Sequence, residues 1–331
     1  MTKAVHLFLA VLCPFTGGAQ AQTSDNVFGL HNVGVLDERI CAGCESPKLT
    51  SGGTFRGDDA DRPHQDGMFA RQAYVGADNK LGVLTIGRQY NPQFLALTDG
   101  GDPFQDVVAS AANRARYTAV GNDSTVQYAT SQLHGLSASA IYSFGETTFS
   151  SVTNRAYGAT LGYADGPVTL SISHQRKSNY VDTGGPVPFA GNSASNSLVA
   201  AKFNFGASTA YAAYGHNQGA GSLPWNVSNP YGAMALSTPS TDSRDVLMGV
   251  AVPLGATTLL ASYIRKDDRN LASQDAHQLA VGFSIALSTH TDLYASYAKI
   301  KNKNGVSNAL GNATEPGRGD SALNVGLWHS F

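Results

Sequence analysis

Hydrophobic and polar residues alternate with a period of two in many segments of the chain, each about ten residues long. Segment 135–145 illustrates the pattern, and segments 155–164, 167–176 and 276–286 repeat it. One face of 135–145 consists of Leu136, Ala138, Ala140, Tyr142 and Phe144, and the other carries Ser137, Ser139 and Ser143 together with Ile141. Because successive side chains of a strand point to opposite faces, the alternation predicts β-strands.

The connections between these segments are alternately short and long. Tight turns are predicted at 164–167, 205–208, 253–256 and 287–291. Longer polar stretches, rich in Gly, Asn, Ser and Pro, occupy 177–196, 217–243 and 302–320. Short turns at one end of a sheet and long loops at the other are typical of a transmembrane β-barrel, with periplasmic turns and extracellular loops.

The composition of the two faces supports a barrel in a membrane. One face carries Ser, Thr, Gly and Asn, and the other is apolar with Tyr and Phe near the strand ends. Aromatic residues at strand ends match the interfacial girdles of outer-membrane barrels. A strand with an open edge in lipid would leave backbone groups unpaired, at several kcal/mol each, so the barrel is expected to close.

About fifteen strand segments can be placed, and since bacterial barrels have even strand numbers we expect about sixteen, one of them poorly marked. The segments are 26–35, 51–57, 68–76, 81–89, 122–130, 135–145, 155–164, 167–176, 197–206, 207–216, 245–253, 256–266, 276–286, 289–300 and 321–331. The predicted fold class is all-β, a transmembrane antiparallel β-barrel.

The overall composition narrows the class further. Charged residues make up 14% of the chain, below the roughly 25% of soluble domains. There is no apolar run of about 20 residues, so a helical membrane span is excluded. The net charge of −2 argues against nucleic acid as a partner. We find no cofactor motif and no paired metal-ligand motif.

The N-terminal stretch reads as a secretory signal. A basic Lys3 precedes an apolar run from Ala4 to Phe15, and a small-x-small motif predicts cleavage between Ala21 and Gln22. Residues 1–21 are therefore predicted to be a signal peptide and residues 22–331 the barrel domain. Cys41 and Cys44 fit a redox pair, half of a zinc site or a local disulfide, and the last is favoured in an exported chain.

Five stretches of the chain carry a family resemblance: 69–90 (FARQAYVGADNKLGVLTIGRQY), 101–104 (GDPF), 122–130 (NDSTVQYAT), 290–302 (HTDLYASYAKIKN) and the terminal GLWHSF. In these stretches the chain resembles the beta-proteobacterial type of Gram-negative general diffusion porin. The resemblance implies a homotrimer in the outer membrane of a Gram-negative bacterium, passing small hydrophilic solutes and ions. It also implies that the terminal Phe331 is presented to the barrel assembly machinery. One departure is that a strand expected between FRGDD and ARQAYVG is missing.

The resemblance also implies a constriction in place of a catalytic centre. In such porins the third long loop folds into the pore, and here that loop is expected from Tyr90 to about Arg116. Opposed acidic and basic side chains would create a transverse field that sets ion preference. The candidate acids are Asp99, Asp102 and Asp106, and the candidate bases are Arg56, Arg71, Arg88, Arg114 and Arg116.

Two alternatives remain open for these residues. An Asp in a glycine-rich loop is equally well a turn former. Arg71 and Arg88 fall on the same face of their strands as apolar residues. If that face meets lipid, the arginines must lie at strand ends or beyond a bulge. Lys202 alternates with Val199 and Phe203 and is predicted to face the lumen.

The leading function is a passive channel. A non-conducting structural or adhesin-like outer-membrane barrel is the alternative. An outer-membrane enzyme is not favoured, because Ser173 and His174 are adjacent on one strand and point to opposite faces. A soluble β-sandwich is not favoured either, since it would not explain the alternating loop lengths or the apolar C-terminal strand.

Overall fold

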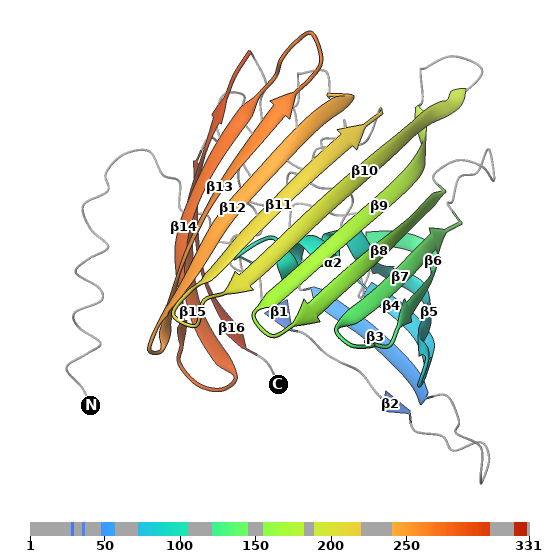
Figure 1. The fold of residues 1–331 in the computed structure, drawn as a ribbon, viewed down its shortest axis with the longest axis horizontal. Helices are drawn as coiled ribbons and strands as arrows, with labels where there is room; N and C mark the ends of the chain where they lie inside the picture. Colours follow the sequence, from blue (N-terminus) through green and yellow to red (C-terminus); the bar gives the residue numbers. More distant parts are fainter. Residues whose placement is uncertain are drawn as a thin grey trace.

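A computed structural model of the chain describes residues 28–29, 35–36, 48–56, 72–104, 121–144, 155–181, 189–219, 240–304 and 321–329. One antiparallel sheet contains all the strands (Figure 1). They are β1 (Phe28–Gly29), β2 (Val35–Leu36), β3 (Lys48–Arg56), β4 (Gln72–Asn79), β5 (Gly82–Tyr90), β6 (Gly121–Thr130), β7 (Leu136–Ser143), β8 (Ala156–Asp165), β9 (Val168–Val181), β10 (Phe189–Asn204), β11 (Thr209–Gln218), β12 (Asp242–Leu254), β13 (Thr257–Asp268), β14 (Ala276–Ala286), β15 (Thr291–Asn302) and β16 (Ser321–His329).

Each strand from β3 to β16 is hydrogen-bonded to the next one along the chain. β1 and β2 both pair with β3, in registers that differ by one residue: Gly29 lies opposite Phe55, and Val35 opposite Thr50. The two fragments therefore form one interrupted edge strand, which corresponds to the predicted segment 26–35. All fifteen predicted segments are found as strands, and the count of sixteen stays a prediction.

The two ends of the sheet approach each other. β1 comes within 8 Å of β16, measured between Cα atoms. The ladder is not closed, because no β1–β16 pairing occurs within the described residues. β3 pairs directly with β4, with Gly53 opposite Ala73, so the sheet has no strand in the place where one was expected from the resemblance.

The predicted sidedness of the connections is confirmed. Short turns join β4–β5, β6–β7, β8–β9, β10–β11, β12–β13 and β14–β15, and they lie at the lower end of the sheet in Figure 1. The described connection between β13 and β14, residues 269–275, lies at the opposite end. β9 and β10 extend into the stretch 177–196 that was predicted to be a loop, with Lys177 opposite Ala194. The sequence analysis missed these parts of the two strands because their Ser and Asn residues are typical of loops. Cross-strand backbone pairing stabilises them as strands.

The two faces of the sheet are as predicted. On β8, Tyr157, Ala159, Leu161 and Tyr163 are exposed on the outside, while Ala156 is buried on the inside. Large apolar side chains on the outer face of other strands include Ile172, Tyr214, Met248, Tyr263 and Val281. Such a surface in contact with water would be unusually apolar, whereas lipid solvates it.

One helix, α2 (Pro92–Gly100), lies inside the sheet (Figure 1). Within the described ranges, no helix combines the length and hydropathy that crossing a membrane requires. The same ranges contain no group of three or more His, Cys, Asp or Glu side chains placed to hold a metal ion. The signal peptide with its cleavage site at Ala21 and Gln22, the pair Cys41 and Cys44, and Phe331 lie outside the described residues.

We predict that Leu161→Arg on the outer face destabilises the barrel in lipid vesicles by about 2–4 kcal/mol, because the side chain lies between two tyrosines at bilayer depth. The free energy of unfolding in urea measures this. Ser137→Arg, on the inner face of neighbouring β7, is the matched control and is expected to cost little. Equal losses in the two variants would contradict the assignment of the faces.

Candidate functional site

The connection after β5 begins with the helix α2, which the sequence analysis did not predict. Asn91 is its N-cap, and its side-chain Oδ1 accepts a hydrogen bond of 2.9 Å from the Gln93 N–H. Pro92 stands at the first helical position, where its missing N–H costs nothing. At the other end the Gly101 N–H donates to the Leu97 carbonyl at 2.7 Å. The Asn-Pro pair followed eight residues later by Gly-Gly was the signal available in the sequence.

This connection crosses the inner wall of the barrel. The Asn91 side-chain amide donates to Gln175 Oε1 on β9. Further along, Gly101 lies against Ala200 on β10 and Ala213 on β11. The segment Asn91–Phe104 therefore starts beside β5 and runs over strands that are far from it in the sheet. It lies against the inner face of the sheet.

Two glycines of the wall make room for the end of this segment. A methyl group on Gly249 of β12 would lie 2.6 Å from Pro103, and one on Gly282 of β14 would lie 3.0 Å from Phe104 Cε1. The first distance is shorter than real Cβ contacts, and the second is tight enough that the Phe104 ring would have to shift. The two small residues thus permit the loop backbone and ring to rest directly on the sheet.

Apolar contacts hold the loop on the wall. Phe104 is completely buried, in a cluster with Tyr211, Ala251, Leu260, Ala276, Ala280, Ala298 and Ile300. Ala96 and Leu97 of α2 share a second cluster with Leu198, Ala200, Ala213, Leu247 and Ile264. These inward-facing apolar residues are the ones that interrupt the otherwise small and polar inner face. Burial of a phenylalanine side chain contributes about 1.5–3 kcal/mol, so the anchor at Phe104 is substantial.

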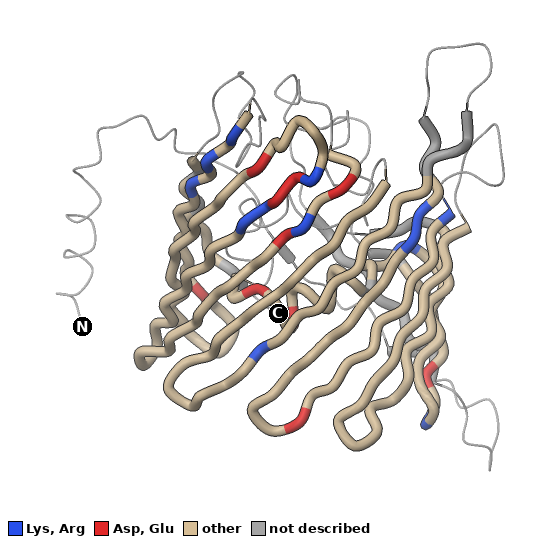
Figure 2. The backbone as a smooth tube through the Cα atoms, turned by 45° about the horizontal axis from the view of Figure 1, so that its top comes forward, with Lys and Arg blue, Asp and Glu red and all other residues tan. Residues whose placement is uncertain are grey.

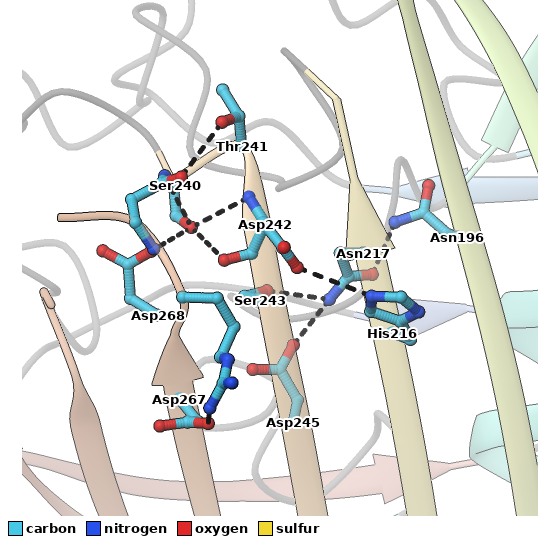
Figure 3. Close-up of polar contacts among 12 residues, drawn as sticks. Asn196, His216, Asn217, Ser240, Thr241, Asp242, Ser243, Asp245, Asp267 and Asp268 are labelled. Atoms are coloured by element: carbon cyan, nitrogen blue, oxygen red, sulfur yellow. Dashed lines mark hydrogen bonds and ion pairs between the residues drawn. The ribbon is translucent and has the colours of Figure 1, made fainter.

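Beside these clusters a polar ladder follows the inner face from β10 to β13 (Figure 3). Asn196 Nδ2 donates to Asn217 Oδ1 at 2.6 Å, and Asn217 Nδ2 donates to Asp245 Oδ2 at 2.7 Å. Lys266 Nζ lies 3.8 Å from Asp245 Oδ1. All four side chains are buried, so the one cation and one carboxylate neutralise each other and bind the strands together.

The two described loop acids have different surroundings. Asp102 is 2% exposed, and its Oδ1 accepts a hydrogen bond of 2.9 Å from the Phe104 N–H. This is a turn-forming role, the alternative left open for a loop aspartate. Asp99, near the end of α2, is exposed to the interior. Partial burial by the surrounding wall raises the pKa of the Asp99 carboxyl, and the Lys202 ammonium opposes this shift.

The prediction that Lys202 faces the lumen agrees with this, because its charge acts on Asp99. Lys202 is on β10, two residues after the inward-facing, fully buried Ala200. Sequence alternation alone placed it correctly. Asp99 and Lys202 are thus an acid and a base brought together from a loop and a wall strand.

The candidate arginines are less fully described. Arg88 is half-buried on β5, in phase with the outward Leu84 and Ile86, and it lies at a register shift where Asp123 and Ser124 of β6 oppose it. The extra residue belongs to β6, so the alternation of β5 continues from the buried Thr85 to the buried Gln89, and Arg88 stays in the outward phase near the end of the strand. Arg56 ends β3, where its backbone lies opposite Phe28. Arg71, Asp106, Arg114 and Arg116 lie outside the described residues.

The class of protein follows from this architecture. An antiparallel sheet with an apolar outer face, a small and polar inner face and a loop folded inside is an outer-membrane barrel that serves as a passive channel. Residues 41–305 match the family described as Gram-negative porin. The chain belongs to this family, whose members are channels of the outer membrane and not enzymes.

Individual relatives support the same fold. The chain is 23% identical to outer membrane porin protein 32 of Delftia acidovorans over 374 aligned positions, covering 99% of this chain and all of the relative. The anion-selective porin from Comamonas acidovorans matches with a TM-score of 0.64 at 20% identity, over 88% of this chain and 86% of the other. OmpT of Vibrio cholerae in its trimer form matches with a TM-score of 0.59 at 14% identity, over 87% of each chain.

We predict that Phe104→Ala releases the end of the inner loop. The loss of a fully buried ring is expected to lower the free energy of unfolding by about 3–5 kcal/mol and to make the single-channel current larger and noisier. Phe144→Ala removes the same ring from the outer surface and is the control, expected to change neither the current nor the noise. An unchanged current in Phe104→Ala would mean that the loop does not limit flow.

Proposed function

We propose that the channel passes small hydrophilic solutes and ions by diffusion through the part of the lumen left open beside the segment Pro92–Phe104. The observation that carries this proposal is the attachment of that segment to the inner wall from β9 to β14. A loop held by buried side chains does not have to move for each solute. Flow through such a pore is set by its width and by the charges that face the water.

In this proposal the constriction is an acid of the loop opposite bases of the wall. Asp99 is the described loop acid that reaches the water of the interior, and Lys202 is the wall cation whose charge acts on it. Asp102 and Asp106 on the loop, and Arg56, Arg71, Arg88, Arg114 and Arg116, remain further candidates. Arginine suits this task because it keeps its charge in every setting of the pore.

We further propose a homotrimer without enzymatic activity, in contact with outer-membrane lipid and assembled by the barrel machinery. The trimer form of the Vibrio cholerae relative supports the oligomeric state. The Comamonas relative is an anion-selective porin, which makes anions the first solutes to test.

Current through a planar bilayer tests the channel and its assembly together. We predict that detergent-extracted protein inserts in steps of three equal conductance levels, because each subunit of a trimer carries its own pore. Steps of one level would contradict the trimer. No steps from protein shown to be folded would contradict the open channel and favour a non-conducting structural barrel.

Ion preference tests the proposed pair. We predict that Asp99→Asn shifts the zero-current potential in a salt gradient toward anions and that Lys202→Gln shifts it toward cations. Each permeability ratio should change about twofold to fivefold, the effect of one charge several Å away in water. Lys299→Gln removes an exposed lysine from the outer face of β15 and is the control for charge alone, expected to leave the potential unchanged.

The same measurement has a predicted pH dependence. The raised pKa of Asp99 means that the carboxyl binds a proton at a higher pH than a free aspartate does, so acidification shifts the wild-type channel toward anions before other aspartates titrate. Asp99→Asn should lack this step. A step that persists in the variant would assign the titration to another group.

A further inference from the structure

A group of basic side chains lies on the outer surface of the barrel, apart from the pore. Its members, called here the outer basic patch, are Arg265 on β13 and Lys299 and Lys301 on β15. Arg244 on β12 and Arg269 after β13 lie at its margin. Figure 2 shows Lys and Arg, interspersed with Asp, at the long-loop ends of these strands, above a band that carries almost no charge.

The strand register brings the patch together. Arg265 lies opposite His277 of β14, and His277 lies opposite Lys301. Lys299 lies opposite Leu279 of β14, and Leu279 lies opposite Tyr263 of β13. Tyr263 is two residues before Arg265 on the same strand. Neighbouring strands are about 4.8 Å apart and residues two apart on one strand about 6.8 Å, so the backbones of the three cations lie within about 12 Å of one another on the outer face.

The side chains of the patch point away from the lumen. Ile264 and Lys266, on either side of Arg265, are buried on the inner face, as are Ala298 and Ile300 on either side of Lys299. Arg265 itself has 55% of its side chain exposed. The patch therefore cannot act on solutes inside the pore.

The positive charge of the patch is only partly neutralised. Asp267 lies 3.8 Å from Arg265 and 3.3 Å from Arg269, so two arginines share one carboxylate. Lys299 and Lys301 form no ion pair with any described residue. Exposed pairs of this kind contribute little, and grouping like charges without a ligand is unfavourable.

The height of the patch on the barrel identifies its ligand. Tyr263 and Tyr297 each stand one step below a patch cation on the same face, and Met248, Leu279 and Val281 continue the apolar surface away from the loops. Exposed aromatic side chains mark the level of the lipid headgroups. A cation just above them meets the phosphate groups of the leaflet, and the long loops make this the outward leaflet, where phosphorylated glycolipids are found.

We propose that the outer basic patch is a binding site for a phosphorylated glycolipid of the outer leaflet. Arg265, Lys299 and Lys301 bind its phosphates through charge-assisted hydrogen bonds, and its acyl chains lie along Met248, Leu279 and Val281. A second copy of the chain as the occupant is decided by the test below, because loss of a subunit contact would change the oligomeric mass of the variant. A free anion would leave the adjoining apolar surface without a partner.

The test measures binding of bisphosphorylated lipid A to the intact, detergent-extracted protein by native mass spectrometry over a range of lipid concentrations. The combined variant Arg265→Gln, Lys299→Gln and Lys301→Gln is expected to raise the dissociation constant at least about tenfold. The charge-retaining variant Arg265→Lys, Lys299→Arg and Lys301→Arg should stay within about threefold of wild type. Channel conductance should be unchanged in both, so a failure of the lipid site is distinguishable from a failure of the pore.

Arg176→Gln is the matched control. Arg176 is on the outer face of β9 at the same end of the barrel, but it lies opposite the uncharged Tyr157 and Ser195. An equal loss of lipid in this variant would overturn the proposal, as would full binding by the glutamine triple variant or by lipid A without its phosphates. Displacement of the lipid by millimolar inorganic phosphate, or a change of oligomeric mass in the triple variant, would also overturn it. If the triple variant does not fold, Lys299→Gln and Lys301→Gln separately decide.

Discussion

The constraint on which the structure depends is that a backbone N–H or C=O in lipid has no water to bond and must find a partner in the protein. From β3 to β16 each strand is hydrogen-bonded to the next, which meets this requirement. The fragments β1 and β2 pair with the other side of β3, and β1 lies near β16. Between the two edges each strand is paired on both sides, so its side chains point to one of only two faces. The period of two in the sequence is the consequence, because one face must satisfy lipid and the other the interior.

The inner face of the sheet must in addition hold a loop without filling the pore. Small residues at Gly249 and Gly282 let Pro103 and Phe104 come close to the wall, and alanines of β10 and β11 do the same for the glycines after α2. The loop is thereby held on one side of the lumen by packing. Asp102 fixes the turn before Phe104, because its Oδ1 accepts a hydrogen bond from the Phe104 N–H.

The sequence predicts an element correctly where one physical rule determines it. It does not do so where two rules compete. Strands with an apolar outer face, such as β8, follow from alternation alone. The outer parts of β9 and β10 rise above the apolar band, so their polar residues resembled a loop. The helix α2 was missed because its apolar residues face a wall that no local pattern reveals. Aspartates were ambiguous for the same reason: Asp99 and Asp102 differ in surroundings and not in local sequence.

Arg265 and Lys266 show how far position in the sheet decides the role of a charge. They are consecutive on β13, yet the lysine is buried inside against Asp245 and the arginine is exposed outside beside Asp267. Removal of a charge from water costs several kcal/mol, so the inner lysine requires its carboxylate and the ladder of amides around it. The outer arginine keeps its hydration and can exchange Asp267 for another anion at small cost. The buried cation therefore serves to stabilise the fold, whereas the exposed cation one residue away can bind a ligand.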